Sequence, residues 1–277
     1  MLTALSLQRE LRTGSSLPLL VEASDRHVYV VKPHGSGDGV VASIVEWIAL
    51  ELGARLDLPV AKPYAIRLNP GFETQAKDPE VRELIERSHG VNFATAWIGG
   101  AKPLDSETLD DLDPEVRSSL FLFDLFLLNI DRHANNLNAV FGPRGLLCMD
   151  FASSVSIRQC LMGRRAEERA DYLRQLRRNP FFQAQIDPEP FIERLRSVAG
   201  GMPFTIPSEW EESLAGALGS KLQVDGLGQR MWALLDQAQV LRSRLRVLEG
   251  IPLETDADRR QRADENKAEF IRRFGPL

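Results

Sequence analysis

The spacing of hydrophobic residues changes near residue 100, and this change constrains the fold more than any other feature of the sequence. Before it, β-branched and aromatic runs alternate with turn residues, and one long helical pattern interrupts them over residues 41–57. After it, apolar residues recur at helical spacing, first over residues 114–128. We therefore predict an α+β chain of two lobes, with a strand-rich N-lobe over residues 1–100 and a mostly helical C-lobe over residues 101–277.

Local patterns predict the other elements. Residues 17–33 are typical of a β-hairpin, because a Ser-Asp-Arg turn separates two apolar runs. The glycines and proline between Gly99 and Pro103 predict a hinge, and a cleft between two lobes is a favoured place for a ligand. The remaining expectations are strands at 60–68 and 91–98, a short helix at 78–87, a hairpin at 139–149, a helix at 232–248 and a solvated helix or tail from 254.

Composition excludes several classes of protein. The chain has 34 Lys+Arg and 39 Asp+Glu, a net charge of -5, so no overall attraction to nucleic acid or to an anionic membrane is expected. No apolar run reaches membrane-spanning length, and Glu10 and Arg12 interrupt any signal-peptide core. The two cysteines, Cys148 and Cys160, do not suggest a disulfide framework. We expect a cytoplasmic protein.

The densest group of polar residues lies between the apolar helix and the 139–149 hairpin. It runs Asn129-Ile130-Asp131-Arg132-His133-Ala134-Asn135-Asn136, and only Ile130 and Ala134 are apolar. A carboxylate followed five residues later by an amide is an arrangement that phosphoryl transfer uses: Asp131 would accept or orient a hydroxyl proton and Asn136 would bind Mg²⁺. Taken alone, the two residues fit an ordinary helix cap and turn as well.

Two further groups would complete such a site. Asp150 begins the Asp-Phe-Ala sequence after the predicted hairpin, and it supplies a second oxygen ligand of the kind Mg²⁺ prefers. Lys32 ends the Tyr-Val-Val-Lys run, as the lysine of protein kinases ends its strand. Glu46, near the start of the following helix, would pair with Lys32 and hold the ammonium toward phosphates. Two alternatives remain open: Glu51 in place of Glu46, and Lys32 as an edge-protecting lysine.

Together these segments resemble the HipA-like kinase family, a branch of the protein-kinase-like fold. The resemblance is carried by Val28 to Lys32, by Ser43 to Pro59, by Asn129 to Asn136 and by Asp150-Phe151, which appear in the family's order over residues 28–154. The Asn-x-Asp-Arg-His-x-x-Asn string is its specific part. A stand-alone kinase domain of this family is the closer match, because the HipA toxins carry an additional N-terminal subdomain.

The resemblance implies an enzyme that uses ATP and Mg²⁺. It makes Asp131 the catalytic base, Asn136 and Asp150 the Mg²⁺ ligands, and Lys32 the residue that contacts phosphates, while His133 would orient the loop. The acceptor would be a hydroxyl, first a protein serine or threonine, with Ser153 and Ser154 as autophosphorylation candidates if that segment is exposed. A regulatory protein partner is compatible with this family.

Two departures define the alternatives. No Gly-x-Gly-x-x-Gly loop precedes Lys32, and Gly35, Gly37 and Gly39 follow it, so this stretch is first a flexible loop and only second a cover for a nucleotide. A nucleotide-binding regulatory protein without transferase activity is therefore the second hypothesis, and a small-molecule kinase is the third. Asp150-Phe151-Ala152 also lacks the glycine of protein kinases, so no movable activation segment is expected.

Overall fold

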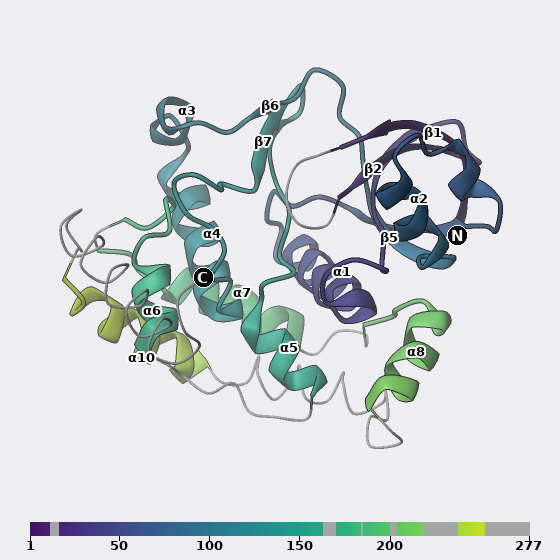
Figure 1. Ribbon diagram of the computed structural model, residues 1–277. Helices are drawn as coiled ribbons and strands as arrows, with labels where there is room; N and C mark the ends of the chain where they lie inside the picture. Colours follow the sequence, from purple (N-terminus) through teal and green to yellow (C-terminus); the bar gives the residue numbers. More distant parts are fainter. Residues whose placement is uncertain (12–16, 163–169, 184, 200–203, 219–237, 253–277) are drawn as a thin grey trace, which may run out of the picture.

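The computed structural model describes residues 1–11, 17–162, 170–183, 185–199, 204–218 and 238–252. The chain is α+β, with strands concentrated at the N-terminal side and helices at the C-terminal side, as predicted. Figure 1 shows the strands before residue 100 gathered on the right and most of the helices on the left, with one long helix, α1 (Gly39–Arg55), between them.

Five strands close into a small barrel in the order β1-β2-β3-β5-β4. Their bounds are β1 (Leu2–Glu10), β2 (Leu19–Ala23), β3 (Val28–Lys32), β4 (Pro63–Leu68) and β5 (Gly90–Ala96). The predicted hairpin is present as β2 and β3, which pair antiparallel. The barrel closes through a short parallel pairing of β1 with β4. Closure leaves no free edge at β3, so Lys32 does not protect a sheet edge.

Strand β1 was not predicted from the sequence. Its burial does not alternate along the whole strand, since Ser6 and Leu7 are both half-buried and Gln8 and Arg9 are both exposed, and its pairing with β2 is interrupted by two register shifts. A strand with bulges loses the two-residue period on which sequence recognition depends. Pairing with β2 and β4, and not a local alternating pattern, therefore determines this strand.

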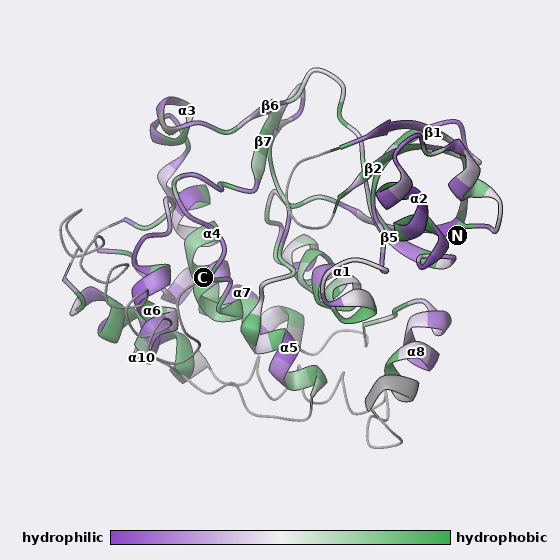
Figure 2. Ribbon diagram, viewed as in Figure 1, coloured by the Kyte–Doolittle hydropathy of each residue, from purple (hydrophilic) through white to green (hydrophobic). Residues whose placement is uncertain are grey.

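Helices make up most of the rest of the described chain. Figure 2 shows α4 changing from hydrophilic at its first turn, where Asp113 caps it, to hydrophobic toward its end. The helices are α1 (Gly39–Arg55), the short η1 (Phe72–Gln75), α2 (Pro79–Glu86), α3 (Ser106–Asp110), α4 (Pro114–Leu127), α5 (Val155–Leu161), α6 (Ala170–Leu176), α7 (Glu189–Ala199), α8 (Ser208–Leu218) and α10 (Ala238–Glu249). Helix α10 matches the second part of the helix predicted at 232–248; residues 232–237 and the predicted tail from 254 lie outside the described residues.

A second, three-stranded sheet lies between the barrel and the helices. It has the order β6-β7-β8, with β6 (Lys102–Pro103), β7 (Ala139–Gly142) and β8 (Gly145–Cys148), so the predicted 139–149 hairpin is confirmed. Cys148 is tied to the chain before β4, because its amide donates to Pro59 O at 2.7 Å and its carbonyl accepts from Ala61 N at 2.8 Å. This pairing fixes the end of β8, and with it the position of Asp150.

Two hydrophobic clusters form the core. The smaller fills the barrel, while the larger joins α1 to the C-terminal helices, so this long helix packs mainly with the part of the chain beyond residue 100. Helix α8 returns to the barrel: Trp210 packs edge-on against Trp47 and donates its indole N–H to Val91 O at 2.8 Å. The part of the chain beyond residue 100 therefore contacts the first hundred residues in two places: through the core around α1, and through Trp210 of α8 against Trp47 and β5.

The length of the helices and the state of the two cysteines can be compared with what the sequence predicts. Of the helices in the described ranges, none has the length and apolarity needed to cross a bilayer. Cys148 and Cys160 are both buried and do not form a disulfide, and burial raises the pKa of Cys148 to about 12, which keeps it a thiol. A buried thiol of this kind is a poor nucleophile.

Candidate active site

A cavity of about 860 Å³ lies where the barrel, α1 and the three-stranded sheet meet. Its lining includes apolar side chains, among them Val30, Phe93, Leu104, Val140 and Met149. The charged lining groups are two cations, Lys32 and Arg158, and four carboxylates, Asp38, Glu46, Asp131 and Asp150. Two positive and four negative groups give the described lining a formal charge of −2. An apolar pocket with a few convergent polar groups is the common form of a small-molecule site.

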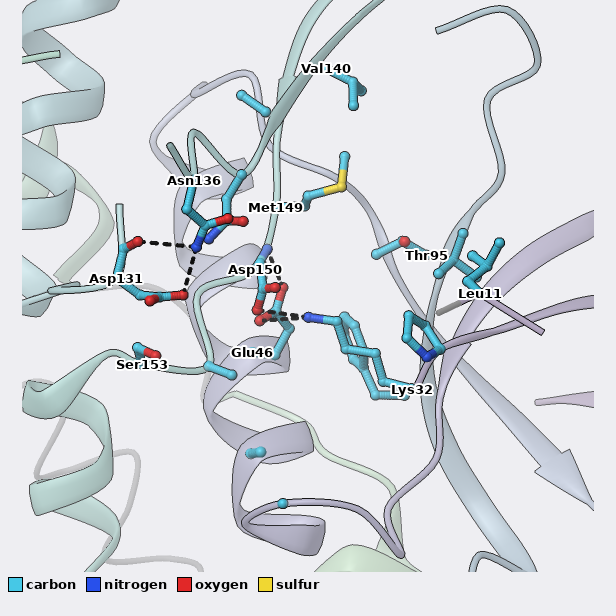
Figure 3. Close-up of a pocket in the computed structure, with 18 of the residues that line it drawn as sticks. Leu11, Lys32, Glu46, Thr95, Asp131, Asn136, Val140, Met149, Asp150 and Ser153 are labelled. Carbon is cyan, nitrogen blue, oxygen red and sulfur yellow. Dashed lines mark hydrogen bonds and ion pairs between the residues drawn. The ribbon is translucent and has the colours of Figure 1, made fainter. Parts of the chain in front are cut away.

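Lys32, Glu46 and Asp150 meet in this cavity from three separate elements (Figure 3). The Lys32 Nζ lies 2.8 Å from Asp150 Oδ1 and 3.7 Å from Glu46 Oε2. The other oxygen of Glu46 accepts the backbone N–H of Asp150 at 2.8 Å. The pairing of Lys32 with Glu46 expected from the sequence is thus present, and Asp150 completes a cluster of one cation and two carboxylates.

Burial and charge act on the ionisation of this cluster. Burial raises the pKa of Glu46 above its ordinary value of 4.5, and the carboxylate of Asp150 acts in the same direction, while Lys32 opposes them. Burial would lower the pKa of Lys32, but the charges of Glu46 and Asp150 raise it above 10.5. Glu46 Oε2 is also buried without a hydrogen-bond partner. The cluster carries one negative charge more than its lysine compensates.

Asp150 has an unusual backbone conformation. Its φ is +61°, in the left-handed region, which aspartate tolerates better than most residues. The preceding residue is held in place, because Met149 N donates to Asn138 O at 2.9 Å. Local strain of this kind, maintained by surrounding hydrogen bonds, is common at functional sites.

Asp131 and Asn136 form a second pair on the opposite side of the cavity from Lys32 (Figure 3). The side-chain amide of Asn136 donates to Asp131 Oδ2 at 2.9 Å and to the Asp131 carbonyl at 3.2 Å. These bonds fix the orientation of the amide: its N–H₂ faces Asp131, so its carbonyl oxygen remains as the acceptor. The five-residue spacing therefore lets Asn136 bond back to Asp131 within one loop. The amide oxygen of Asn136 and the second carboxylate oxygen of Asp131 remain for a ligand.

His133 is the one predicted site residue that does not line the cavity. Its side chain is exposed, and its ring Nδ1 accepts from Asn135 N at 3.3 Å. Its backbone pairs with that of Asn136 in both directions, at 3.2 and 2.8 Å. His133 contributes to the shape of the loop through these backbone bonds, and the role of its side chain stays a prediction.

A buried network beneath this loop was not predicted. Arg132 Nε donates to Asp124 Oδ2 at 2.7 Å, and Asn129 and Asn179 each donate to the same carboxylate at 2.7 Å. Arg132 also donates to the carbonyls of Leu137 and Asn138. A lone aspartate in the apolar run of residues 120–128 is the sequence signal for this network, but nothing in the sequence specifies which cation meets it.

The glycine-containing loop before α1 has two parts. The first is anchored, since His34 N donates to Asn92 Oδ1 at 2.8 Å and Gly35 N donates to Ser88 Oγ at 2.9 Å. The second part, with Gly37 and Gly39 at positive φ, lines the cavity. The loop thus stands beside the site, although it follows Lys32 in the sequence and does not precede it.

The two serines after Asp150 differ. Ser153 lines the cavity and, in Figure 3, lies on the same side as Asp131. Ser154 has no exposed surface, and its hydroxyl donates to Phe151 O at 2.6 Å. Ser154 was a candidate acceptor only if its segment is exposed, and this condition is not met, because the turn that starts α5 buries it.

The oxygen-rich donor set fits Mg²⁺ bound together with a nucleotide. Asp150 offers a carboxylate beside the uncompensated charge of Glu46, and Asn136 offers an amide oxygen. In the part of the chain that the structure describes, no cluster of three or more His, Cys, Asp or Glu side chains forms an all-protein metal site. Mg²⁺ commonly uses one or two carboxylates and takes its other ligands from phosphates and water.

Comparisons with known proteins complete these observations. A family model described as HipA-like kinase matches residues 5–160. Among solved structures, the chain is similar to the proinflammatory kinase CtkA of Helicobacter pylori, with 13% identity, a TM-score of 0.42, and coverage of 89% of this chain and 96% of that one. It is also similar to the MAP kinase LmaMPK10 of Leishmania major, with 11% identity, a TM-score of 0.23, and coverage of 91% and 85%. A search of curated proteins found no match.

Proposed function

The chain belongs to the HipA-like kinase family, and from this premise we propose that it transfers the γ-phosphoryl group of ATP, with Mg²⁺, to a hydroxyl group, most simply that of a protein serine or threonine. The observation that carries the proposal is the meeting of Lys32, Glu46 and Asp150 in one cavity that also contains Asp131 and Asn136. We also propose that this cavity is the cleft between an N-lobe of residues 1–100 and a C-lobe of residues 101–277.

Lys32 is assigned to the phosphates of the nucleotide. Glu46 pairs with the ammonium from the buried side, since the Glu46 side chain is 1% exposed. Lys32 is 23% exposed and lines the cavity, so its ammonium is accessible to a ligand there. The raised pKa of Lys32 keeps it charged at any physiological pH. A lysine held by a buried glutamate is the arrangement that positions phosphates in kinases.

Asp131 is assigned to the acceptor hydroxyl. Asn136 orients its carboxylate through Oδ2, so the other oxygen is available to accept the hydroxyl proton in the transition state. Asn136 and Asp150 would hold Mg²⁺ through their side-chain oxygens. Mg²⁺, when bound with ATP, supplies positive charge that stabilises the phosphate oxygens during transfer. The negative lining of the cavity makes such a cation necessary for a polyphosphate to bind.

The apolar part of the cavity suits the base of the nucleotide. Val30, Leu104 and Met149 offer aliphatic surface and Phe93 offers a flat ring in the same cavity as the charged groups. A cavity with both kinds of lining suits a molecule that has an apolar end and a polyanionic end. His133 remains a positioning residue that shapes the loop without touching the substrate.

The experiment that tests this function is intact-protein mass spectrometry after incubation with ATP and Mg²⁺, comparing the wild type with Asp131→Ala. We expect a gain of one or more phosphoryl groups in the wild type, or in an added protein substrate, and none in the variant. The matched control is Asp113→Ala, which removes a carboxylate at the start of α4 outside the cavity. Equal phosphorylation by wild type and Asp131→Ala would exclude the proposed role of Asp131.

A second candidate is a nucleotide-binding regulatory protein that does not transfer phosphate. The absence of a Gly-x-Gly-x-x-Gly sequence before Lys32 favours it. Its signature would be ATP-dependent thermal stabilisation without phosphorylation of this chain, of added proteins or of small-molecule alcohols. Phosphorylation of a small alcohol alone would instead indicate a small-molecule kinase.

A further inference from the structure

The second cation of the cavity, Arg158, has no role in the function proposed above. It lies on α5, eight residues after Asp150, and its Nη1 is 2.7 Å from Asp38 Oδ2 in the loop before α1. Its Nη2 donates to Ala152 O at 3.2 Å. The ion pair therefore joins the glycine-containing loop to the segment that follows Asp150, and all of these residues line the cavity.

The two cations of the cavity differ in how firmly they are held. Lys32 contacts two carboxylates, one of them fully buried. Within the part of the chain that the structure describes, Arg158 contacts one carboxylate, and that partner, Asp38, is 63% exposed. An ion pair with an exposed partner contributes little, since solvent already compensates both charges. The guanidinium of Arg158 is thus the cation of this cavity that an incoming anion can recruit most readily.

Asp38 lies at a place that suits a phosphate group. It precedes the first turn of α1, and its side chain makes no capping hydrogen bond to the helix. Asp38 is thus the residue at the positive end of a 17-residue helix, and its carboxylate pairs with the guanidinium of Arg158 and not with the helix N–H groups. Helix N-terminal N–H groups and guanidinium both bind phosphate oxygens, guanidinium through two parallel hydrogen bonds.

We propose that Arg158 binds a phosphate group of the nucleotide in this cavity, and that Asp38 competes with the phosphate for the guanidinium. The inference rests on the proposed function, because it assumes that a nucleoside polyphosphate occupies the cavity. When the nucleotide binds, Arg158 exchanges the carboxylate of Asp38 for phosphate oxygens. The loop of residues 33–39 is then released from α5.

This proposal predicts effects of opposite sign for the two partners of one ion pair. Arg158→Gln should weaken the binding of Mg²⁺-ATP by roughly tenfold or more, because it removes a charged donor from the phosphate. Asp38→Asn should tighten it by roughly two- to fivefold, because it removes the competitor. Arg158→Lys should lie between wild type and Arg158→Gln, since it keeps the charge and loses the two-donor geometry.

The measurement is isothermal titration of the purified full chain with Mg²⁺-ATP and, separately, with adenosine, which has no phosphate. Adenosine affinity should be the same in wild type, Arg158→Gln, Asp38→Asn and Arg158→Lys. In the double variant, Asp38→Asn should have no effect once Arg158 is replaced, because the competition is gone. Arg242→Gln is the matched control: it breaks an ion pair of similar exposure between α10 and Glu189, outside the cavity lining, and should leave ATP affinity unchanged.

Three results would overturn the proposal. If Asp38→Asn weakens ATP binding as Arg158→Gln does, the pair only holds the loop in place. If Arg158→Gln and Arg158→Lys, folded as judged by thermal unfolding, both bind ATP like wild type, Arg158 does not contact phosphate. If wild type binds neither ATP nor adenosine, the proposed function fails as well, whereas normal ATP binding with an inert Arg158 removes only this inference.

Discussion

Two cations that pair with carboxylates, Lys32 and Arg132, show how the same kind of interaction can serve either a binding site or the fold. Arg132 is 1% exposed and faces one carboxylate, Asp124, that is equally buried, so the pair is electrically neutral. Lys32 is 23% exposed and faces two carboxylates, so its cluster retains a negative charge that opens onto a cavity. A balanced and enclosed pair can only support the fold, whereas an unbalanced and accessible one can bind a further cation.

The surroundings of the two cations support this distinction. Arg132 also lies over the ring of Phe151 at 4.9 Å and that of Phe181 at 5.5 Å, and the carboxylate of Asp124 accepts from two asparagines. Among the described residues, each cluster contains a buried polar atom without a hydrogen-bond partner, Arg132 Nη2 in one and Glu46 Oε2 in the other, so the clusters differ in net charge and exposure and not in this respect. The Arg132 network fixes the loop that carries Asp131, and the Lys32 cluster forms the surface that the loop faces.

The largest effect should come from breaking the balanced pair. Asp124→Ala leaves the charge of Arg132 buried without a partner, and we expect it to lower the free energy of unfolding by about 3–5 kcal/mol. Urea unfolding at neutral pH measures this loss. A loss below about 1 kcal/mol would mean that Arg132 is compensated from elsewhere, and the comparison would not stand.

Removing a carboxylate from the unbalanced cluster should instead affect activity. Asp150→Asn leaves Lys32 with Glu46 as a neutral pair, so the free energy of unfolding should stay near that of wild type. Phosphoryl transfer should fall by about 100-fold or more, because the charged Mg²⁺ ligand is gone. Asp57→Asn is the matched control: Asp57 has a similar left-handed φ of +55° and lies outside the cavity lining. An unfolding defect in Asp150→Asn alone would show that the excess charge is structural.

Ligand binding should distinguish the clusters next. At about 100 times its dissociation constant, Mg²⁺-ATP should stabilise the wild type by about 2.7 kcal/mol, which thermal unfolding detects as a rise in Tm of several degrees. The rise should shrink in Asp150→Asn and persist in Asp57→Asn. An equal rise in Asp150→Asn would place the nucleotide away from the Lys32 cluster.

The smallest effect concerns pH. Because burial raises the pKa of Glu46 above 4.5, its contribution to stability is fully present below pH 4.5 and is lost as the pH rises through the folded-state pKa. The wild type should therefore lose stability relative to Glu46→Gln between mildly acidic and neutral pH. Urea unfolding of both proteins across that range measures the difference.

Glu73 provides a control of opposite sign. Hydrogen bonds from its own backbone N–H and from His89 and Gly71 lower the pKa of Glu73, so its contribution is present above 4.5 and is lost as the pH falls through the folded-state pKa. Relative to Glu73→Gln, the wild type should gain stability as the pH rises. The same slope in both pairs of proteins would contradict the assignment of Glu46.

Some residues of the site could be selected from the sequence, and one choice could be made only from the structure. Lys32, Asp131, Asn136 and Asp150 could be selected from the sequence, because their types and their order are those of phosphoryl transfer. The choice between Glu46 and Glu51 could not, since both lie on one helix. Structure decides it: Glu46 faces Lys32, while Glu51 pairs with Arg55 at 3.7 Å on the same helix.

Contacts between distant segments could not be predicted from the sequence. The partner of Asp124 depends on how the loop folds back, and the place of Arg158 depends on α5 meeting the loop before α1. Strand β1 likewise depends on pairing with β4, some sixty residues away, and not on its own hydrophobic pattern. Local periodicity specified the hairpins and helices; the pairings between them arise from tertiary packing.

The docking of α8 on the barrel has a practical consequence for dissecting this protein. Every residue proposed to touch substrate precedes residue 161, and the family match also ends at 160. A fragment cut there would nevertheless lose Trp210, which is 1% exposed against Trp47 and β5, and would uncover apolar surface on α1. We expect such a truncated protein to aggregate on expression, so the minimal unit for recombinant work extends at least through α8.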